Sequence, residues 1–422
     1  MENKAPFPPK AWYRNLELVY SIFGIGLVVG LIFWPLLDSL FSIGLAAYWL
    51  LFARKNFSTP RARYVLLFCL LYVMVLVGVL YSANMKEALF KLQLKSAFLV
   101  FPLVFGTTEG LSAGVFRRIF GAFIGATLLG CLFCLASGLY VWVTTGSVHQ
   151  LYGYELVVVK DMHPFVLGLC GLLSLLYLLV RHLERFRQEG RLSVPAAEMA
   201  AAAFLFLFLL LLGNRNTLIF LGGVLLFFGF RLIPRIGTRL LFLGSFVLVV
   251  TAAVLFNPSF RRQWYDLVDF SKENTIQLDQ DASLGRGWGG KAIRLTIWKC
   301  SMDVLEQHWA AGVGTGDLQD TLQRAYEKRK FYFASRYNSY NAHNQYLEEF
   351  LTRGIAGLLV FLACILWPLL VGIREKDTLY TLYLLCFAFF CITESMLELH
   401  KGVMWYSFFN ALLFFRNSKA LI

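Results

Sequence analysis

Apolar residues are gathered into long blocks along the chain, and short polar stretches separate one block from the next. A block of roughly 20 apolar residues is long enough for an α-helix to cross the hydrocarbon core of a bilayer. The pattern predicts twelve such helices, several of them short or sharing a boundary. Their expected ranges are about 18–36, 38–54, 64–82, 94–106, 118–143, 164–180, 195–212, 217–231, 239–256, 350–373, 378–396 and 402–416.

One apolar block has to contain two helices. The stretch LFLFLLLLGNRNTLIFLGGVLLFFGF, residues 205–230, is too long for a single span, and GNRNT in its middle has the composition of a turn. A lone arginine at the bilayer centre would be costly. We therefore expect two helices that are joined at the membrane surface, with Arg215 in the turn between them.

The composition is typical of a polytopic all-α membrane protein. Hydrophobic residues make up 58% of the 422 residues and charged residues only 15%, and the mean hydropathy is +0.62. Soluble domains are nearer to half apolar and a quarter charged, so the surplus apolar surface is expected to face the lipid bilayer. No cleavage site follows the first apolar block, which predicts a retained anchor and not a signal peptide.

The cysteines add no cross-links to this picture. Seven of the eight lie inside apolar blocks, where cysteine behaves as a small hydrophobic residue, and only Cys300 lies in a polar region. Cys131 and Cys134 form a CxxC pair, but the pair stands inside an expected span without further ligands. The sequence therefore predicts packing cysteines and no disulfide framework.

Lysine and arginine are distributed unevenly between the alternating loops. With the N-terminus in the cytoplasm, the inner segments hold 20 of these residues and the short outer segments hold 6. Cytoplasmic loops of membrane proteins carry this excess of positive charge. The count predicts that both termini face the cytoplasm. It also explains much of the net charge of +13, which therefore needs no nucleic-acid partner.

One segment is too long to be a simple connection between spans. Residues 257–343 are expected outside, between a membrane domain of nine spans over 1–256 and one of three spans over 344–422. Within it, KAIRLTIWKCSMDVLEQH at 291–308 has helical spacing, and the glycine-rich GVGTGD at 312–317 is expected to be a turn. We predict one large outer loop with its own helices.

The outer face carries many cations but no recognisable metal-binding or nucleophile motif. Arg215 stands between two apolar helices without an acidic residue nearby in the sequence. Arg286, Lys291 and Arg294 cluster in RGWGGKAIR and form a candidate anion site. A second basic group is interpreted as a solvated surface. Its members are Arg324, Lys328, Arg329, Lys330 and Arg336.

Two histidines stand at the outer ends of expected spans. His343 precedes the helix that leads into the tenth span, where Asn344 is suited to cap the helix or to orient a ligand. His163 precedes Pro164 at the start of the sixth span. Imidazole accepts a proton near neutral pH, so each histidine is a candidate base. Packing at the membrane interface is the alternative for both.

Glu394 and Glu398 are spaced four residues apart at the expected outer end of the eleventh span. In a helix, this spacing places both carboxylates on one face. Two interpretations stay open. The pair is either an ordinary set of interfacial acids, or a functional pair that partners an arginine or competes as a base.

The stretch HNQYLEEFLTRG at 343–354 resembles the signature of the bacterial O-antigen ligase and polymerase superfamily, in which His-Asn-x-x-Leu is followed by Gly after six residues. The twelve expected spans, the long outer loop before the motif and the arginine in a short outer turn fit the same family. So do RLTIW at 294–298 and the His-Pro pair at 163–164. The motif covers about a dozen residues, and the layout covers most of the chain.

The resemblance implies a fold like that of the GT-C class of glycosyltransferases, acting at the periplasmic face of the bacterial inner membrane. It implies a glycan donor carried on undecaprenyl diphosphate and an acceptor sugar of the lipid A–core. By motif, His343 is the implied catalytic residue and Arg215 and Arg294 are the essential cations, while Asn344 and Leu347 complete the motif. No cofactor and no metal are expected.

The chemistry of such a transfer agrees with the residues present. Negative charge develops on the departing diphosphate, and fixed cations stabilise that charge. A cluster of arginines can take the place of the divalent metal that many glycosyltransferases use, and His343 is placed to accept the proton of the attacking hydroxyl. We expect direct displacement with inversion at the anomeric carbon.

An O-antigen ligase is the favoured interpretation, and three alternatives stay open. The nearest is the polymerase of the same superfamily, whose acceptor is another lipid-linked glycan. The related protein O-oligosaccharyltransferases usually carry a larger soluble C-terminal region, whereas this chain ends with RNSKALI soon after the last expected span. A transporter of lipid-linked glycans would show an internal repeat and polar residues near mid-membrane.

Overall fold

The computed structural model describes residues 10–52, 61–108, 111–190, 193–268 and 290–416, and the regular elements in these ranges are all helices. The α-helices are α1 (Lys10–Phe33), α2 (Pro35–Leu51), α3 (Arg63–Leu80), α4 (Met85–Leu94), α5 (Ala97–Gly106), α6 (Ala113–Thr145), α7 (Pro164–Glu189), α8 (Ala196–Leu212), α9 (Arg215–Leu232), α10 (Ile236–Phe256), α11 (Pro258–Val268), α12 (Gly290–His308), α13 (Leu318–Lys328), α14 (Gln345–Arg374), α15 (Thr378–Phe390) and α16 (His400–Phe415). Shorter elements are η1 (His149–Leu151), η2 (Gly153–Leu156), η3 (Phe333–Asn338) and η4 (Met396–Glu398). The expected all-α class is confirmed.

A helix stands at each of the twelve expected spans, but the helices differ in length. Within the described ranges, seven helical stretches are long and apolar enough to cross a membrane. They are Arg63–Leu80, Met85–Gly106, Ala113–Thr145, Pro164–Glu189, Arg215–Leu232, Ile236–Phe256 and Gln345–Arg374. Shorter apolar helices accompany them, at Glu17–Phe33, Pro35–Leu51, Ala196–Leu212 and Thr378–Phe390. The chain is thus a multi-pass membrane protein, for which helix length supports seven crossings and leaves the other five expected spans open.

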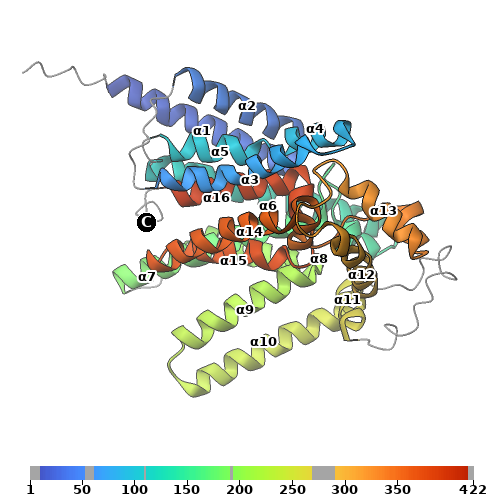
Figure 1. Ribbon diagram of the computed structural model, residues 1–422. Coiled ribbons are helices and arrows are strands. Elements are labelled where there is room, and N and C mark those ends of the chain that lie inside the picture. Colours follow the sequence, from blue (N-terminus) through green and yellow to red (C-terminus); the bar gives the residue numbers. More distant parts are fainter. Residues whose placement is uncertain (1–9, 53–60, 109–110, 191–192, 269–289, 417–422) are drawn as a thin grey trace, which may run out of the picture.

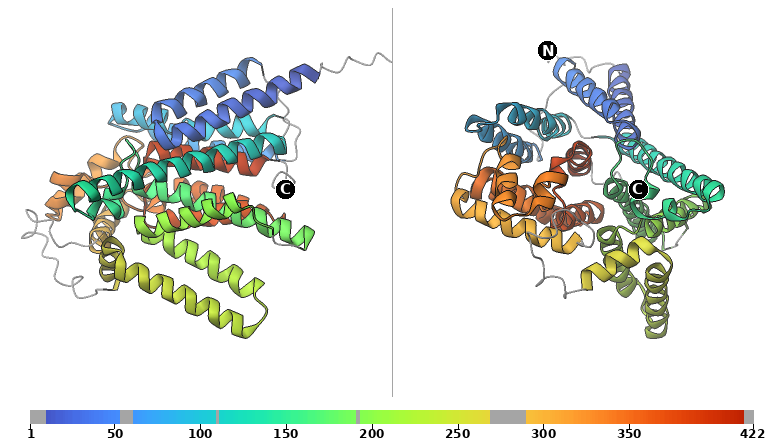
Figure 2. Two further views of the ribbon diagram at one scale, coloured as in Figure 1. Left: turned by 180° about the vertical axis from the view of Figure 1, so that it is seen from behind. Right: turned by 90° about the vertical axis from the view of Figure 1, so that its right-hand side faces the viewer.

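The first and last described helices share one end of the bundle, and the outer helices gather at the other (Figure 1). Helix α1 begins and α16 ends on the side where the C-terminus is marked, whereas α4, α11, α12 and α13 lie at the far end. Figure 2 shows the same separation from behind. The predicted topology requires this arrangement, in which α1 begins and α16 ends on one side while α11, α12 and α13 lie on the other.

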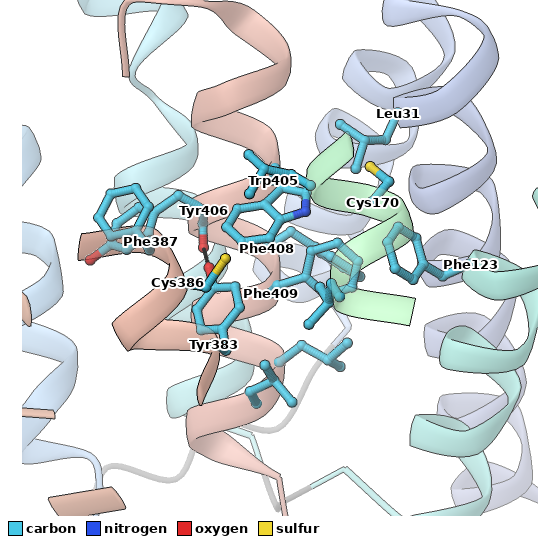
Figure 3. Close-up of a cluster of buried hydrophobic side chains, with 14 of the residues drawn as sticks. Leu31, Phe123, Cys170, Tyr383, Cys386, Phe387, Trp405, Tyr406, Phe408 and Phe409 are labelled. Carbon is cyan, nitrogen blue, oxygen red and sulfur yellow. Dashed lines mark hydrogen bonds between the residues drawn. The ribbon is translucent and has the colours of Figure 1, made fainter. Parts of the chain in front are cut away.

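Helix α16 lies at the centre of the bundle because it is apolar around most of its circumference. Every residue from Lys401 to Phe415 is buried, as in a helix that other helices enclose. Aromatic rings fill the space around it (Figure 3): the rings of Phe387 and Tyr406 stack with centroids 4.0 Å apart, and Phe123 meets Phe409 edge-on at 4.6 Å. This packing fixes α16 and with it the segment that precedes it.

The cysteines are part of the same packing. All eight are buried, and none has a disulfide partner. Cys131 and Cys134 lie on α6 with no exposed surface, and they belong to the large hydrophobic core. They act as small hydrophobic side chains there.

The loop between α12 and α13 attaches the outer helices to the membrane helices. Gly312 and Gly314 have φ angles of 74° and 104°, and a Cβ on Gly312 would collide with the backbone of Thr352 in α14. The Gly314 N–H donates to the Thr352 carbonyl at 3.0 Å, and the Thr315 N–H donates to the Gly78 carbonyl of α3 at 3.1 Å. GVGTGD is therefore a turn, as predicted, and its glycines permit the close contact.

Helix α14 bends at Gly354, where the φ and ψ angles of 63° and −162° are not helical. A Cβ on Gly354 would meet the carbonyl of Ala310, and the Ile355 N–H donates to the Trp309 carbonyl at 2.9 Å. The glycine that closes the His-Asn-x-x-Leu pattern is thus required by a backbone contact with the outer segment.

Helices α9 and α10 project from the bundle as a hairpin (Figures 1 and 2). No residue of α10 is buried within the described protein, although the helix is strongly apolar. A spanning helix of this kind is expected to expose its surface to lipid.

Candidate active site

Arg215 is the first residue of α9 and follows the turn that was predicted between two apolar helices. Helix α8 ends before Gly213, whose φ of 62° is left-handed. The Asn214 side chain then caps α9 by accepting from the N–H groups of Asn216 and Thr217 at 3.1 and 3.3 Å. The five residues GNRNT therefore end one helix and begin the next, and Arg215 is half-buried at this junction.

Thr393 joins this turn to two other parts of the site. Its hydroxyl accepts from the Asn216 side-chain amide at 2.6 Å, and its carbonyl oxygen accepts from Nε of Arg294 at 3.0 Å. Thr393 belongs to residues 391–399, a segment without α-helix that links α15 to α16. One residue thus brings α9, α12 and the 391–399 segment together.

Glu394 and Glu398 do not share a helix face, so the prediction drawn from their spacing was wrong. Helix α15 ends at Phe390, short of the expected range 378–396, and residues 391–399 continue as turns that include η4. Besides its local turns, the segment bonds to distant helices: the Thr393 hydroxyl accepts from the Asn216 side chain, and the Leu397 N–H donates to Oε1 of Gln345 at 2.8 Å. The two carboxylates therefore have different partners.

Glu398 belongs to a separate, buried ionic group. Its carboxylate pairs with Lys91 of α4 and with Lys95, the residue that follows α4. Burial would raise the pKa of Glu398, but the two lysine charges hold the pKa well below its usual range, so the carboxylate is ionised at neutral pH. This group ties the 391–399 segment to the C-terminal end of α4.

His343 stands in the turn before α14 with a left-handed φ of 45°. For a residue other than glycine this conformation costs about 1–2 kcal/mol, so the surroundings have to hold it in place. The next residue, Asn344, caps α14 by accepting from the Leu347 N–H at 3.0 Å, and the predicted capping role is confirmed. The ring of Tyr340 meets the imidazole with centroids 5.4 Å apart.

His343, Glu394 and Arg294 form the centre of the candidate site. Nδ1 of His343 lies 3.5 Å from Oε2 of Glu394, which is an ion-pair distance and too long for a strong hydrogen bond. Nη2 of Arg294 lies 2.7 Å from Oε1 of the same carboxylate. The three side chains are 19–26% exposed, so a substrate can reach them.

Glu394 is held in its charged form. Burial alone would raise the pKa of its carboxyl, but the interaction with His343 and the charge of Arg294 together lower that pKa below its ordinary value. Glu394 is therefore an ionised acceptor at neutral pH. A carboxylate behind an imidazole fixes the orientation and tautomer of the ring and stabilises the imidazolium form.

Arg294 is anchored by more than Glu394. In addition to the Thr393 bond, its Nη1 donates to the Gly290 carbonyl at 3.3 Å. A guanidinium has five N–H donors, so about two remain beyond those that bond to the protein. The group is thus fixed in position and still has donors for an anionic ligand.

His163 caps α7 at the edge of the site. Its Nδ1 accepts from the Phe165 N–H at 3.3 Å, and its Nε2 lies 3.3 Å from the Tyr154 hydroxyl. Burial lowers the pKa of His163, although the nearby Glu394 charge opposes that effect, so the ring is neutral. With Nδ1 accepting, the proton lies on Nε2. The cap therefore uses the lone pair that a general base would need, which favours His343 as the base.

The other predicted cations belong to the candidate anion site or to the second basic group. Lys291 is half-buried in the first turn of α12, the helix that carries Arg294, and Arg286 lies outside the described residues. In the second basic group, Arg329 pairs with Asp303 and is 42% exposed, in keeping with a solvated surface. Arg324, Lys328 and Lys330 are exposed as well, and the side chain of Arg336 lies outside the described part.

Several residues of the site were not identified from the sequence. Tyr154 and Thr393 carry no motif, and only the fold brings them to His163 and Arg294. Ser395 and Glu348 contact the backbone beside His343. Glu348 lies inside the HNQYLEE stretch, one helical turn after the asparagine cap. Its place in the motif could have identified it as a site residue from the sequence.

The centre holds one carboxylate, one guanidinium cation and one imidazole. Across the described ranges, no group of three or more His, Cys, Asp or Glu side chains could hold a metal ion. The arginine that faces Glu394 makes the site suited to an anionic group of a ligand.

Residues 200–362 match a family model that is described as O-antigen ligase. The matched range contains Arg215, Arg294 and His343, whereas His163 and Glu394 lie outside it. No curated protein matches the chain. Residues 200–362 of the chain are therefore similar to the O-antigen ligase family.

Proposed function

We propose that the protein is an O-antigen ligase. It transfers a glycan from undecaprenyl diphosphate to a hydroxyl of a lipid A–core sugar, at the periplasmic face of the bacterial inner membrane. The observation that carries this proposal is the joint position of His343, Glu394 and Arg294, with contacts of 3.5 and 2.7 Å at one carboxylate. A GT-C-like fold with twelve spans and a periplasmic 257–343 loop is part of the same proposal.

In the transfer, the oxygen of the acceptor hydroxyl forms a bond to the anomeric carbon of the glycan. The bond between that carbon and the diphosphate oxygen breaks, and undecaprenyl diphosphate leaves. The hydroxyl proton passes to the protein. A single displacement of this kind inverts the configuration at the anomeric carbon.

His343 accepts the proton. Its Nδ1 faces the ionised Glu394, so the lone pair that takes the proton is on Nε2. The imidazolium that forms is stabilised by the carboxylate at 3.5 Å. Asn344 supports this geometry because its cap begins the helix directly after His343.

The cations stabilise the charge on the leaving diphosphate. Arg294 has donors left for phosphate oxygens, and Arg215 starts a helix whose N-terminus also favours an anion. Lys291 stands one turn before Arg294 on α12, and Arg286 is proposed to contribute from the preceding segment. Fixed cations of this kind lower the barrier when charge develops on the leaving group.

The test is transfer by the purified full-length protein in detergent, with a glycan on undecaprenyl diphosphate as donor. Three acceptors are compared: lipid A–core, a second undecaprenyl diphosphate-linked glycan, and a serine- and threonine-containing peptide. A shift in mobility of lipid A–core alone supports the ligase. Transfer to the second lipid-linked glycan would identify a polymerase instead, and the absence of any covalent product with an intact donor would favour a transporter.

A further inference from the structure

A closed set of hydrogen bonds surrounds the backbone on both sides of His343. Oε2 of Glu348 accepts from the Ala342 N–H at 3.1 Å and from the Ser395 hydroxyl at 3.1 Å. The Ser395 oxygen in turn accepts from the Asn344 N–H at 3.2 Å. The residues before and after His343 are thus fixed by one carboxylate oxygen and one hydroxyl.

This set of bonds holds a conformation that the chain would not adopt by itself. His343 has a φ of 45°, and its own N–H donates to Oδ1 of Asn341 at 3.0 Å. A strained residue of this kind persists only where its surroundings determine its geometry. Removing the bonds to Ala342 and Asn344 would let the turn relax and move the imidazole.

The same bonds fix the partner of His343. Ser395 is the neighbour of Glu394, so the Glu348–Ser395 bond also sets the position of the carboxylate that faces Nδ1. Gln345 gives the segment two further bonds: its N–H donates to the Cys391 carbonyl at 2.8 Å, and its Oε1 accepts from the Leu397 N–H at 2.8 Å. Glu348 therefore connects the turn that contains His343 with the segment that contains Glu394.

We infer that Glu348 is a positioning residue for the transfer, which aligns the base His343 with Glu394 through Ala342 and Ser395. The inference rests on the proposed role of His343. Glu348 itself is 5% exposed and acts on the reaction only through the two turns. A purely structural acid in the buried ionic group around Glu398 is the competing explanation.

The neighbouring residue gives a matched control. Glu349 is buried to the same degree, with 4% exposure, and lies on the same helix. Its carboxylate pairs with Arg353 and accepts from the Gln345 side-chain amide at 2.9 Å. Neither of these bonds is to residues 342–344 or 393–395, so a change at Glu349 tests burial and charge without loosening the turns directly.

The experiment compares Glu348→Leu and Glu348→Gln with Glu349→Leu and Glu349→Gln in the purified full-length protein. A misplacement of about 1 Å costs about 10²-fold in rate, so kcat of Glu348→Leu is expected to fall about 10²-fold, with KM values for donor and acceptor changed less than about threefold. Glu348→Gln keeps an oxygen that can accept both bonds and is expected to restore kcat to within about tenfold of wild type. Both Glu349 variants are expected to lose thermal stability while their kcat per folded protein stays near wild type.

Ser395→Ala provides a second route, because it removes the Glu348–Ser395 bond and the bond from the Asn344 N–H while Glu348 keeps its charge and its bond from the Ala342 N–H. The inference is overturned if Glu348→Leu and Ser395→Ala keep wild-type kcat while His343→Asn is inactive. It is also overturned if the Glu348 and Glu349 variants lose kcat equally, or if Glu348→Gln is no better than Glu348→Leu. If His343→Asn itself stays active, the proposed function fails first, so the two failures are distinguishable.

Discussion

Nδ1 of His343 lies 3.5 Å from Oε2 of Glu394, although helices α14 and α15 separate the two residues along the chain. His343 belongs to the His-Asn motif, and Glu394 belongs to a segment that the motif does not include. The pair is made by the break in helix after Phe390, which turns Glu394 back towards the start of α14. The candidate site therefore depends on two turns that have to be held against each other.

Replacement of His343 should abolish most of the transfer. His343→Asn is the sharper variant because asparagine tolerates the left-handed backbone better than most residues, so the turn is preserved while the base is lost. We expect a loss of about 10²–10⁴-fold in kcat with donor binding little changed. The exposed His308 at the end of α12 supplies the control, since His308→Ala should be fully active. A folded His343→Asn protein with wild-type turnover would refute the role of the base.

Arginine-to-lysine changes separate a fixed guanidinium from a simple positive charge. Arg294→Lys keeps the charge but cannot reproduce the bonds to Thr393, Gly290 and Glu394 together, so we expect turnover to fall roughly tenfold or more. Arg215→Lys is expected to be impaired for the same reason at the diphosphate. Arg324→Lys on the exposed face of α13 should behave as wild type in the same assay. Equal activity of all three variants would mean that charge alone is needed.

The Glu394 carboxylate makes the folding stability of the protein depend on pH. Its pKa in the folded protein lies below the ordinary value, so its contribution is fully present above the pKa of the unfolded chain, about 4.3, and is lost as the pH falls through the folded value. Glu394→Gln is neutral at every pH. The difference in thermal midpoint between wild type and this variant should be constant from about pH 6 to 8 and shrink below about pH 4. A difference that stays the same at about pH 3 would show that the charge contributes nothing.

Removal of divalent metal ions with EDTA tests whether arginine side chains, and not a metal ion, stabilise the leaving diphosphate. If Arg215 and Arg294 provide the positive charge, EDTA should leave the turnover of the purified protein within about twofold of the untreated enzyme. Loss of activity that Mg²⁺ or Mn²⁺ restores would overturn this assignment. Glu394 would then be the first ligand to examine, because Glu398 is already paired with Lys91 and Lys95.

The buried cysteines allow a clean test of topology. All eight native thiols are buried, so a single introduced cysteine should dominate labelling by a membrane-impermeant reagent. Gln307→Cys lies on the exposed end of α12 and Gln188→Cys on the exposed end of α7. In intact spheroplasts the first should be labelled and the second protected, and permeabilised membranes should label both. The opposite pattern would invert the assignment that the loop charges predict.

The sequence alone predicted the positions of the helices and of the two polar helix boundaries, at GNRNT and at His-Asn. Spanning length and apolar content located the twelve helices. The GNRNT stretch predicted a turn, and Asn344 predicted a cap for the helix after His343, because glycine and asparagine have specific backbone roles there. The lengths of the short helices could not be derived in this way. Helix α15 ends at Phe390, and the chain after it bonds to distant residues, as the Leu397 N–H does to Oε1 of Gln345; such bonds are not visible in a local pattern.

The candidate site was predicted only in part for the same reason. His343, Arg294 and His163 are marked by motif or by composition, and the structure brings them to one place together with Glu394. The pairing of Glu394 with Glu398 was wrong because spacing of four residues has meaning only where the helix continues. Thr393 contacts Arg294, which lies 99 residues away in the sequence, and no spacing in the sequence predicts this contact.

The glycine-rich turn after α12 has a consequence for the independence of the outer segment. Its backbone lies directly against Thr352 of α14, and the Thr315 hydroxyl donates to the Val75 carbonyl of α3 at 2.9 Å. A self-sufficient module would satisfy these backbone groups internally. The turn at 312–317 instead takes its hydrogen-bond partners from α3 and α14, so we expect α12 and α13 to need these membrane helices in order to keep their fold.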